Sequence, residues 1–428
     1  MPAICLYFQI HQPYRLSVYD FTRIGEDAEY FANDFNRTIM RQMASEVYNP
    51  ANRILLDMMK KYGEEFRVCF SISGLAWEQM RVAAPELIDS FREMNDLGGV
   101  EWVGETYNHS LASLYARSEF ERQVMAHKQL MEQELGAVCT TFRNTEMLYA
   151  NDLVSDLVRM GFRSVLVPFP ESFTSSGKSP DHIYRSPVSN RLSCITQNNR
   201  LSAELGRFFY EPAHSHYPLK AVKFVQWLDE LDANGAEVVS VYLDYGVVSS
   251  RAGHREQLPS FLKNLVRVAT AHGHLFRTPA QLLGGATPVG DKYDVPAPIT
   301  WAYGDHSLDA FTGNDLQQEA INRLYELEDA VLAKGDASLL RAWSRLQSSD
   351  HFYYMTQRFE ERGEVNRYSP YESALEAYNN LSNGDKTEIL EIGINPYSGF
   401  IYLFLESGLS ICSRFGRPVI YIITNESG

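Results

Sequence analysis

Short apolar runs alternate with helical stretches along roughly the first 290 residues. The runs are rich in aliphatic, aromatic and β-branched residues, which is typical of buried strands. The stretches between them repeat apolar residues with helical spacing, so that Leu153, Leu157 and Met160 share one face. The predicted strands are residues 3–10, 66–73, 100–105, 140–146, 164–169, 194–199 and 238–244, and the predicted helices are residues 50–62, 84–97, 118–135, 151–160, 218–233 and 257–272.

This alternation predicts an α/β fold on a mainly parallel sheet. Seven strands fit a closed or nearly closed (β/α)7-type barrel, which we expect to be a catalytic domain over residues 1–290. Residues 282–299 are rich in Pro and Gly and indicate a linker or a loop wrapping one face. Residues 291–388 predict a helical C-terminal region that packs on the barrel, and residues 389–428 form an atypical tail whose structure the sequence leaves open.

Polar residues follow five of the predicted strands. The carboxyl ends of parallel strands gather at one face of such a fold, where loops build the site. We therefore expect Glu146 and Asp244 to meet across a pocket mouth. The polar residues are His11 and Gln12 after the first strand, Trp77 and Glu78 after the second, Glu105, Asn108 and His109 after the third, Asn144 and Glu146 in the fourth, and Asp244 in the seventh.

Two carboxylates on separate strands suit glycosyl transfer, which needs a nucleophile and a general acid. Asp244 ends an apolar strand, where burial would raise its pKa and keep it protonated. Arg143 and Asn144 would favour an ionised Glu146, but strand alternation places Arg143 on the opposite face, so its help stays open. A lone strand-end acid is also often a helix N-cap or ion-pair partner, and a core or capping role is the alternative for His11.

Composition narrows the class of partner. The 428 residues include 39 basic and 54 acidic side chains, and the formal charge of −15 disfavours nucleic acid and anionic membrane surfaces. Five scattered cysteines without a CxxC motif indicate buried free thiols in a reducing, cytoplasmic compartment. The N-terminus lacks the features of a signal peptide, and no apolar run is long enough to span a membrane.

Five motifs follow one another in the first nine tenths of the chain: HQPYRL (11–16), GETYNHSL (104–111), FRNTEMLY (142–149), YLDY (242–245) and WAYGDHSLDAFTGNDLQ (301–317). In this order they resemble the conserved regions of glycoside hydrolase family 57, the α-amylase-type family with a (β/α)7 barrel and a helical C-terminal region. The resemblance implies a retaining glycosidase on α-glucans, with Glu146 as nucleophile and Asp244 as general acid/base. We expect neither metal nor organic cofactor, and the candidate substrate-binding residues are His11, Gln12, Trp77, Glu105, His109 and Trp301.

The sequence departs from this family at two places. Members commonly carry an acidic residue two positions after the Asp, where this chain has Gly246, and acidic residues after the Trp-Ala pair, where it has Tyr303 and Gly304. A catalytically impaired α-glucan-binding protein is therefore the alternative. A metal-dependent carbohydrate deacetylase is a third hypothesis, for which the close histidine pair His214 and His216 lies in a loop-like segment. Hydrolysis, transfer and branching of glucan all stay open.

Overall fold

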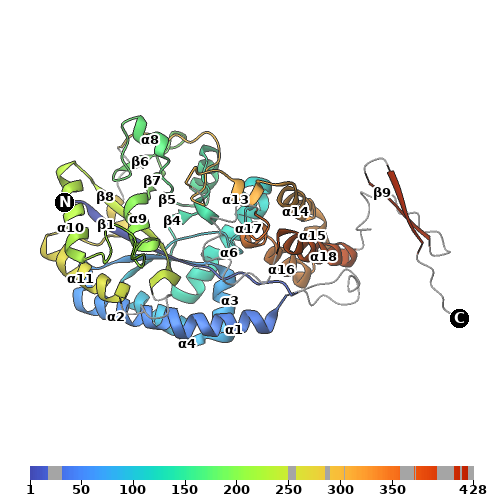
Figure 1. The fold of residues 1–428 in the computed structure, drawn as a ribbon, viewed down its shortest axis with the longest axis horizontal. Coiled ribbons are helices and arrows are strands. Elements are labelled where there is room, and N and C mark those ends of the chain that lie inside the picture. The colour runs from blue at the N-terminus through green and yellow to red at the C-terminus, as the bar shows by residue number, and fades with distance from the viewer. Residues whose placement is uncertain are drawn as a thin grey trace.

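The computed structural model describes residues 1–17, 31–248, 257–284, 290–302, 304–356, 371, 373–392, 409–414 and 417–422 (Figure 1). Tyr303, one of the departures noted in the sequence, lies outside these residues.

Seven parallel strands in the described part of the chain form the core expected from the sequence. One sheet has the order β3-β2-β1-β8, and the other has β4-β5-β7 with the antiparallel β6 at its edge. The strands are β1 (Ala3–Ile10), β2 (Val68–Ile72), β3 (Val100–Trp102), β4 (Thr141–Arg143), β5 (Ser164–Val167), β6 (Ile183–Arg185), β7 (Ser193–Thr196) and β8 (Val238–Asp244).

Backbone hydrogen bonds join the two sheets at both of their seams. Gly104, just after β3, donates to the Thr141 carbonyl and accepts from the Arg143 N–H of β4, each at 2.8 Å. At the other seam Asn198, just after β7, donates to the Ser240 carbonyl of β8 at 2.8 Å. The parallel strands therefore follow one another as β8-β1-β2-β3-β4-β5-β7, which confirms the (β/α)7-type barrel.

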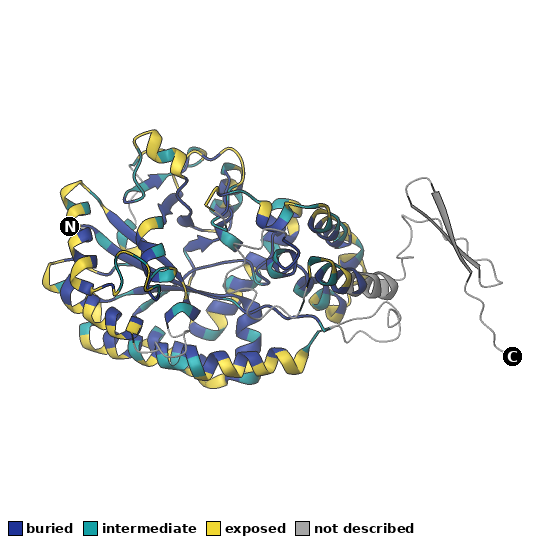
Figure 2. Ribbon diagram, in the orientation of Figure 1, coloured by how far each residue is buried: buried dark blue, intermediate teal, exposed yellow. Residues whose placement is uncertain are grey.

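The barrel interior is apolar at its amino-terminal end. Almost all of β1 is buried because strands flank it on both sides and helices cover its outer face, as expected for parallel sheets. Inside, the rings of Tyr7 and Tyr242 pack edge to face at 5.3 Å, next to the free thiols of Cys5 and Cys69. Figure 2 shows the strands as the buried centre of the molecule.

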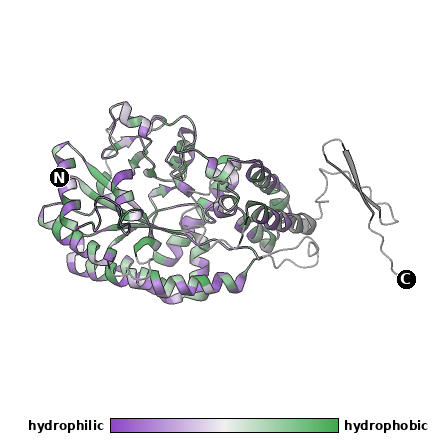
Figure 3. Ribbon diagram, in the orientation of Figure 1, coloured by the Kyte–Doolittle hydropathy of each residue, from purple (hydrophilic) through white to green (hydrophobic). Residues whose placement is uncertain are grey.

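Helices connect the strands and cover the barrel, with hydrophilic and hydrophobic residues mixed along them (Figure 3). Among the described helices, none is both long and apolar enough to cross a membrane. The helices of this region are α1 (Asn33–Met43), α2 (Asn49–Tyr62), α3 (Gly74–Ala83), α4 (Pro85–Asp96), α5 (Ala112–Tyr115), α6 (Arg117–Leu135), α7 (Val154–Arg159), α8 (Glu171–Ser175), α9 (Asn199–Gly206), α10 (Ala221–Ala233), α11 (Gln257–Ala271) and α12 (Pro279–Leu283).

Sequence and structure differ mainly at strand ends. The predicted strand 140–146 stops at Arg143, because the chain turns into left-handed backbone at Glu146 and Met147, whose φ angles are 52° and 50°. Helix α3 was not predicted, since Trp77 and Glu78, which lie in it, were interpreted as residues of a loop after β2. Ser73 caps it by accepting a hydrogen bond from the Ala76 N–H at 3.2 Å. Helices α1 and α9 and strand β6 were also missed.

The C-terminal helices lie at the carboxyl ends of the strands, as expected (Figure 1). They dock by backbone contact, since the Ser349 N–H donates to the His109 carbonyl at 2.9 Å. The segment before them wraps one face of the barrel, where Tyr149 donates to the Ile299 carbonyl at 3.0 Å. These helices are α13 (Asp309–Thr312), α14 (Asp315–Glu326), α15 (Glu328–Lys334), α16 (Ala337–Leu346), α17 (Ser349–Tyr353) and α18 (Ala374–Ile392).

Within the C-terminal tail, strands β9 (Leu409–Arg414) and β10 (Arg417–Ile422) pair antiparallel. The division into units at residues 290 and 388 stays a prediction.

Candidate active site

A tight turn after β4 presents Glu146. Thr145–Met147 form one turn of 3₁₀ helix, and the left-handed backbone at Glu146 costs about 1–3 kcal/mol for a non-glycine residue. Asn144 braces the turn: its side-chain oxygen accepts from the Thr145 N–H at 3.0 Å, and its amide group donates to the Leu148 carbonyl at 3.0 Å. Such strain is typical of functional positions, where the surroundings hold a side chain in one direction.

The Glu146 carboxylate is held by donors on both oxygens. The Nε2 of His109 lies 3.1 Å from Oε1, and the indole N–H of Trp301 donates to Oε2 at 2.9 Å. Burial raises the pKa of Glu146, but the hydrogen bond and positive charge of His109, together with Arg143 and Trp301, outweigh it and lower this pKa below its usual value. Glu146 is therefore ionised, with 22% of its side chain exposed.

His109 lies between two carboxylates. Its Nδ1 is 3.2 Å from Oε2 of Glu105, and its Nε2 faces Glu146, so both ring nitrogens donate and the ring is an imidazolium. Burial lowers the pKa of His109, yet the two carboxylates prevail and raise it to about 9. The cation stays in place at neutral pH and stabilises the charge on Glu146.

Arg143 adds a second positive charge behind Glu146. Its side chain is fully buried, with the guanidinium carbon 4.8 Å from the ring centre of Trp301. Alternation along a strand would have placed the side chains of Arg143 and Glu146 on opposite faces. Because β4 ends at Arg143, Glu146 lies outside the strand and alternation does not set the direction of its side chain. The charge of Arg143 contributes to the lowered pKa of Glu146.

A hydrogen bond from His11, just after β1, reaches the C-terminal helices. Nδ1 of His11 lies 2.7 Å from Oγ of Ser73, and its Nε2 lies 2.8 Å from Oδ2 of Asp350 on α17. The His11 ring also stacks on His109 with centres 4.0 Å apart. Burial raises the pKa of Asp350, but His11 with its hydrogen bond, the charge of His109 and the hydrogen bond from Ser348 outweigh this and hold that pKa well below its ordinary value. Burial and the charge of His109 lower the pKa of His11 itself, so at neutral pH this contact is a hydrogen bond from a neutral ring.

A pocket of about 230 Å³ opens above these residues. Its walls come from the turn after β4, the segment after the barrel and α17, so the helical region completes the site. Asp350, Ser349 and Tyr353 were missed by the sequence analysis, although the polar and aromatic residues of SSDHFYY at a helix start were a usable signal. The lining residues are Glu146, Trp301, Ala302, Ser349, Asp350 and Tyr353.

Asp244 has different surroundings. Strand β8 is buried as far as Leu243, but Asp244 itself is exposed, because the strand emerges at the barrel mouth with its last residue. The expectation that apolar neighbours enclose this carboxyl is therefore wrong. Its Oδ1 accepts from the Gly246 N–H at 2.6 Å, and a Cβ at position 246 would lie 2.7 Å from the same oxygen. Glycine at this position thus leaves room for the carboxylate to bend back on its own chain.

Three of the candidate substrate-binding residues are buried and are not among the residues that line the pocket. Gln12 is buried between Tyr48 and Arg15, at 3.4 and 3.1 Å. Trp77, a residue of α3, is fully buried in the core, and Glu105 is fully buried and hydrogen-bonded to His109. These positions suit support of the site more than contact with a ligand. Trp301 lines the pocket, whereas His11 and His109 contact the lining residues Asp350 and Glu146.

Comparison with known proteins reveals a family likeness. Residues 5–290 match the sequence model of glycosyl hydrolase family 57. The chain is 27% identical over 391 residues to a protein of Methanocaldococcus jannaschii named "Putative alpha-amylase", covering 88% of this chain and 82% of that one.

Solved structures share the fold. A branching enzyme of this family from Thermococcus kodakaraensis superposes with a TM-score of 0.63 at 13% identity over 92% of both chains. The 4-alpha-glucanotransferase of Thermococcus litoralis gives a TM-score of 0.64 at 15% identity, over 98% of this chain and 63% of that one. At these identities the likeness shows the fold alone.

Proposed function

Because the chain belongs to glycosyl hydrolase family 57 and is thus a glycoside hydrolase, we propose that it is a retaining enzyme of the α-amylase or glucanotransferase type acting on α-glucans. The relatives are an α-amylase by name, a branching enzyme and a glucanotransferase, which favours α-linked glucose chains as the substrate class. We assign the nucleophile to Glu146 and the general acid/base to Asp244.

The observation that carries this proposal is the cationic environment of Glu146. A nucleophile must stay ionised to attack the anomeric carbon, and the imidazolium of His109 favours that state from hydrogen-bond distance. The Trp301 N–H fixes the other oxygen, so the carboxylate faces the pocket in one orientation. Both donors are arranged before substrate arrives and therefore need no reorganisation during the reaction.

In the first step, a Glu146 oxygen bonds to the anomeric carbon while the bond to the leaving sugar oxygen breaks. Asp244 gives its proton to that oxygen, which leaves as an alcohol. In the second step Asp244 removes a proton from water, or from an acceptor hydroxyl, which attacks the same carbon and releases Glu146. The two displacements together retain the configuration. The carboxyl groups are expected about 5–5.5 Å apart in the working enzyme.

Asp350 is the other carboxyl group of the pocket and the natural rival for the acid role. Hydrogen bonds from His11 and Ser348 help to keep its pKa low, so at neutral pH it has no proton to donate. We therefore assign Asp350 to positioning His11 and to accepting hydrogen bonds from sugar hydroxyls. Asp244, at the end of another strand, keeps the acid role.

The test is incubation of the purified protein with maltooligosaccharides and soluble starch, followed by chromatography of the products. Shorter chains indicate hydrolysis, longer chains indicate transfer, and new branch points indicate branching. The exposed Asp244 and the neighbouring Gly246 favour one alternative, an impaired α-glucan-binding protein. Measurable maltooligosaccharide binding without turnover of any α-glucan would establish that alternative.

A further inference from the structure

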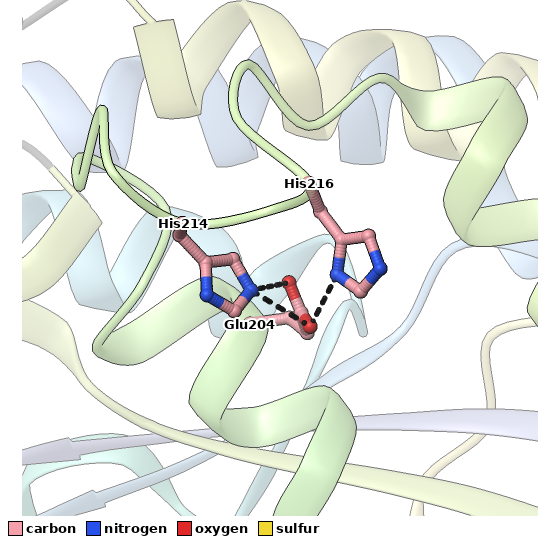
Figure 4. A group of neighbouring side chains, drawn as sticks. All are labelled: Glu204, His214 and His216. Carbon is pink, nitrogen blue, oxygen red and sulfur yellow. Dashed lines mark hydrogen bonds and ion pairs between the residues drawn. The ribbon is translucent and has the colours of Figure 1, made fainter.

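A histidine–carboxylate cluster lies outside the candidate active site. Glu204 is at the end of α9, and His214 and His216 are in the segment that leads to α10 (Figure 4). The Nε2 of His214 is 3.2 Å from both oxygens of Glu204, and Nδ1 of His216 is 2.8 Å from Oε1. Two rings thus converge on one carboxylate, and neither the proposed catalysis nor the pocket uses them.

We propose that Glu204, His214 and His216 bind a divalent transition-metal ion, with Zn²⁺ as the expected occupant. One carboxylate and two imidazoles form a donor set that Zn²⁺ and its neighbours in the first row prefer. All three donor atoms lie within 4.8 Å of one another. Tetrahedral Zn²⁺ with bonds of about 2.0–2.1 Å separates its ligands by about 3.3 Å, so the present spacing needs little adjustment.

The burial of the cluster suits an ion that keeps one bond to solvent. Glu204 is 5% exposed, whereas the side chains of His214 and His216 are 23% and 36% exposed. An ion therefore has a path from solvent to a buried carboxylate, with a fourth position left for water. The His214 ring stacks on Phe208 at 4.4 Å, and the His216 ring meets Trp227 edge to face at 4.9 Å, which restrains both rings.

A second cluster, of one aspartate and two histidines, has a different arrangement. His272 and His274 flank Asp229, but they contact different oxygens, at 3.2 and 2.9 Å. The other nitrogen of His274 lies 3.3 Å from the Pro2 carbonyl, and the ring is fully buried. His274 therefore has both nitrogens engaged. In the described part of the chain, convergence of three such donors within 4.8 Å occurs at Glu204.

Nearby positive charges are expected to weaken the binding of a divalent ion. Arg200 and Lys223 lie over the Trp227 ring at 5.1 and 5.6 Å, and their charge opposes a divalent ion. The ion would tie the segment after α9 to the helix. Ser202 of the same helix accepts a hydrogen bond from the Tyr242 N–H of β8 at 3.1 Å. This bond connects the helix that carries Glu204 to the strand that carries Asp244.

The experiment titrates ZnCl₂ into the tag-free, EDTA-treated full-length chain by calorimetry. We expect one ion per chain and at least about tenfold weaker binding in Glu204→Gln, His214→Asn and His216→Asn. The matched control is His272→Asn, which removes a histidine from the Asp229 cluster and should bind Zn²⁺ as the wild type does. Cu²⁺ should quench the fluorescence of Trp227, and Trp227→Phe should lose that part of the signal.

His216→Asn guards against loss of folding, because this side chain is the most exposed of the three. Saturating Zn²⁺ should raise the unfolding temperature of the wild type and leave that of His216→Asn unchanged. Absence of saturable binding at about 1 mM ZnCl₂, or binding that His216→Asn and Glu204→Gln leave unchanged, would overturn the proposal.

Discussion

The ends of strands β4 and β8 carry the two proposed catalytic carboxyl groups in opposite environments. Glu146, after β4, is held by a histidine cation and an indole N–H. Asp244, at the end of β8, is exposed and bonded to its own chain at Gly246. The first environment fixes one charge state and one direction. The second leaves the carboxyl open to solvent, which suits a group that must exchange a proton in each step.

The two environments indicate different roles for Glu146 and Asp244. Preorganisation around Glu146 stabilises the nucleophile before substrate arrives, and any change there alters every reaction that the enzyme performs. A change at Asp244 alters only steps that need a proton. Variants that change one environment at a time can therefore separate the two roles.

Removal of the nucleophile should have the largest effect. Glu146→Gln keeps the shape of the side chain but cannot form a glycosyl-enzyme, so turnover of every substrate should fall by more than about 10⁴-fold. Rates on maltoheptaose and on α-maltosyl fluoride measure it. Glu171→Gln, at an exposed carboxylate on α8, is the control and should react at the wild-type rate. A Glu146→Gln variant within tenfold of wild type would remove Glu146 from the mechanism.

Loss of the histidine cation should have the second-largest effect on activity. Asn accepts the left-handed backbone that His109 adopts, with φ at 53°, so His109→Asn removes the charge with little strain. We expect kcat/KM to drop by about 10²–10³-fold. The pKa of Glu146 should rise without this partner, and the acidic limb of the pH profile should move to higher pH. An unmoved acidic limb would show that His109 does not control the charge of Glu146.

Stability gives a second measure of the same cation. The pKa of His109 is raised from 6.5 to about 9, so its stabilising effect is complete below about pH 6.5 and is lost as pH rises through about 9. The unfolding temperature of the wild type should therefore fall relative to that of His109→Asn across this window. Parallel curves for the two proteins would contradict the ion pair.

Deletion of the indole donor should have a moderate effect. Trp301→Phe keeps an aromatic ring beside Arg143 but removes the N–H that binds Oε2 of Glu146. A hydrogen bond to a charged group is worth about 1.5–3 kcal/mol, so we expect kcat/KM to fall by about ten- to a hundredfold on all substrates. The control is Trp343→Phe. The indole of Trp343 donates to the Leu324 carbonyl in the helical region, so this variant shows the effect of losing a buried indole away from Glu146.

The smallest change is expected from Gly246→Ala, just after the end of β8. In Gly246→Ala the new Cβ would displace the Asp244 carboxylate from the Gly246 N–H. One such hydrogen bond is worth about 1 kcal/mol, so hydrolysis of maltoheptaose should change by about fivefold and that of α-maltosyl fluoride very little. An equal change on both substrates would mean that position 246 acts through the fold and not through Asp244.

The sequence predicted the barrel well because buried parallel strands have a nearly continuous apolar pattern, as in β1 and β8. It predicted the site less completely. The left-handed turn at Glu146 and the hydrogen bond between Asp350 and His11 depend on contacts between residues far apart in the chain. The apolar run before Asp244 suggested burial of that side chain, but a strand can be buried up to the residue at which it emerges.

The most direct test of this account is the activity of Asp244→Asn on two substrates that differ only in their need for a proton. Fluoride leaves without protonation, whereas the sugar oxygen of maltoheptaose requires it. We predict that Asp244→Asn retains much of the wild-type rate of glycosyl-enzyme formation from α-maltosyl fluoride and loses more than about 10²-fold on maltoheptaose. Equal losses on both substrates would show that Asp244 is not the acid and that this exposed carboxyl has a structural or sugar-binding role.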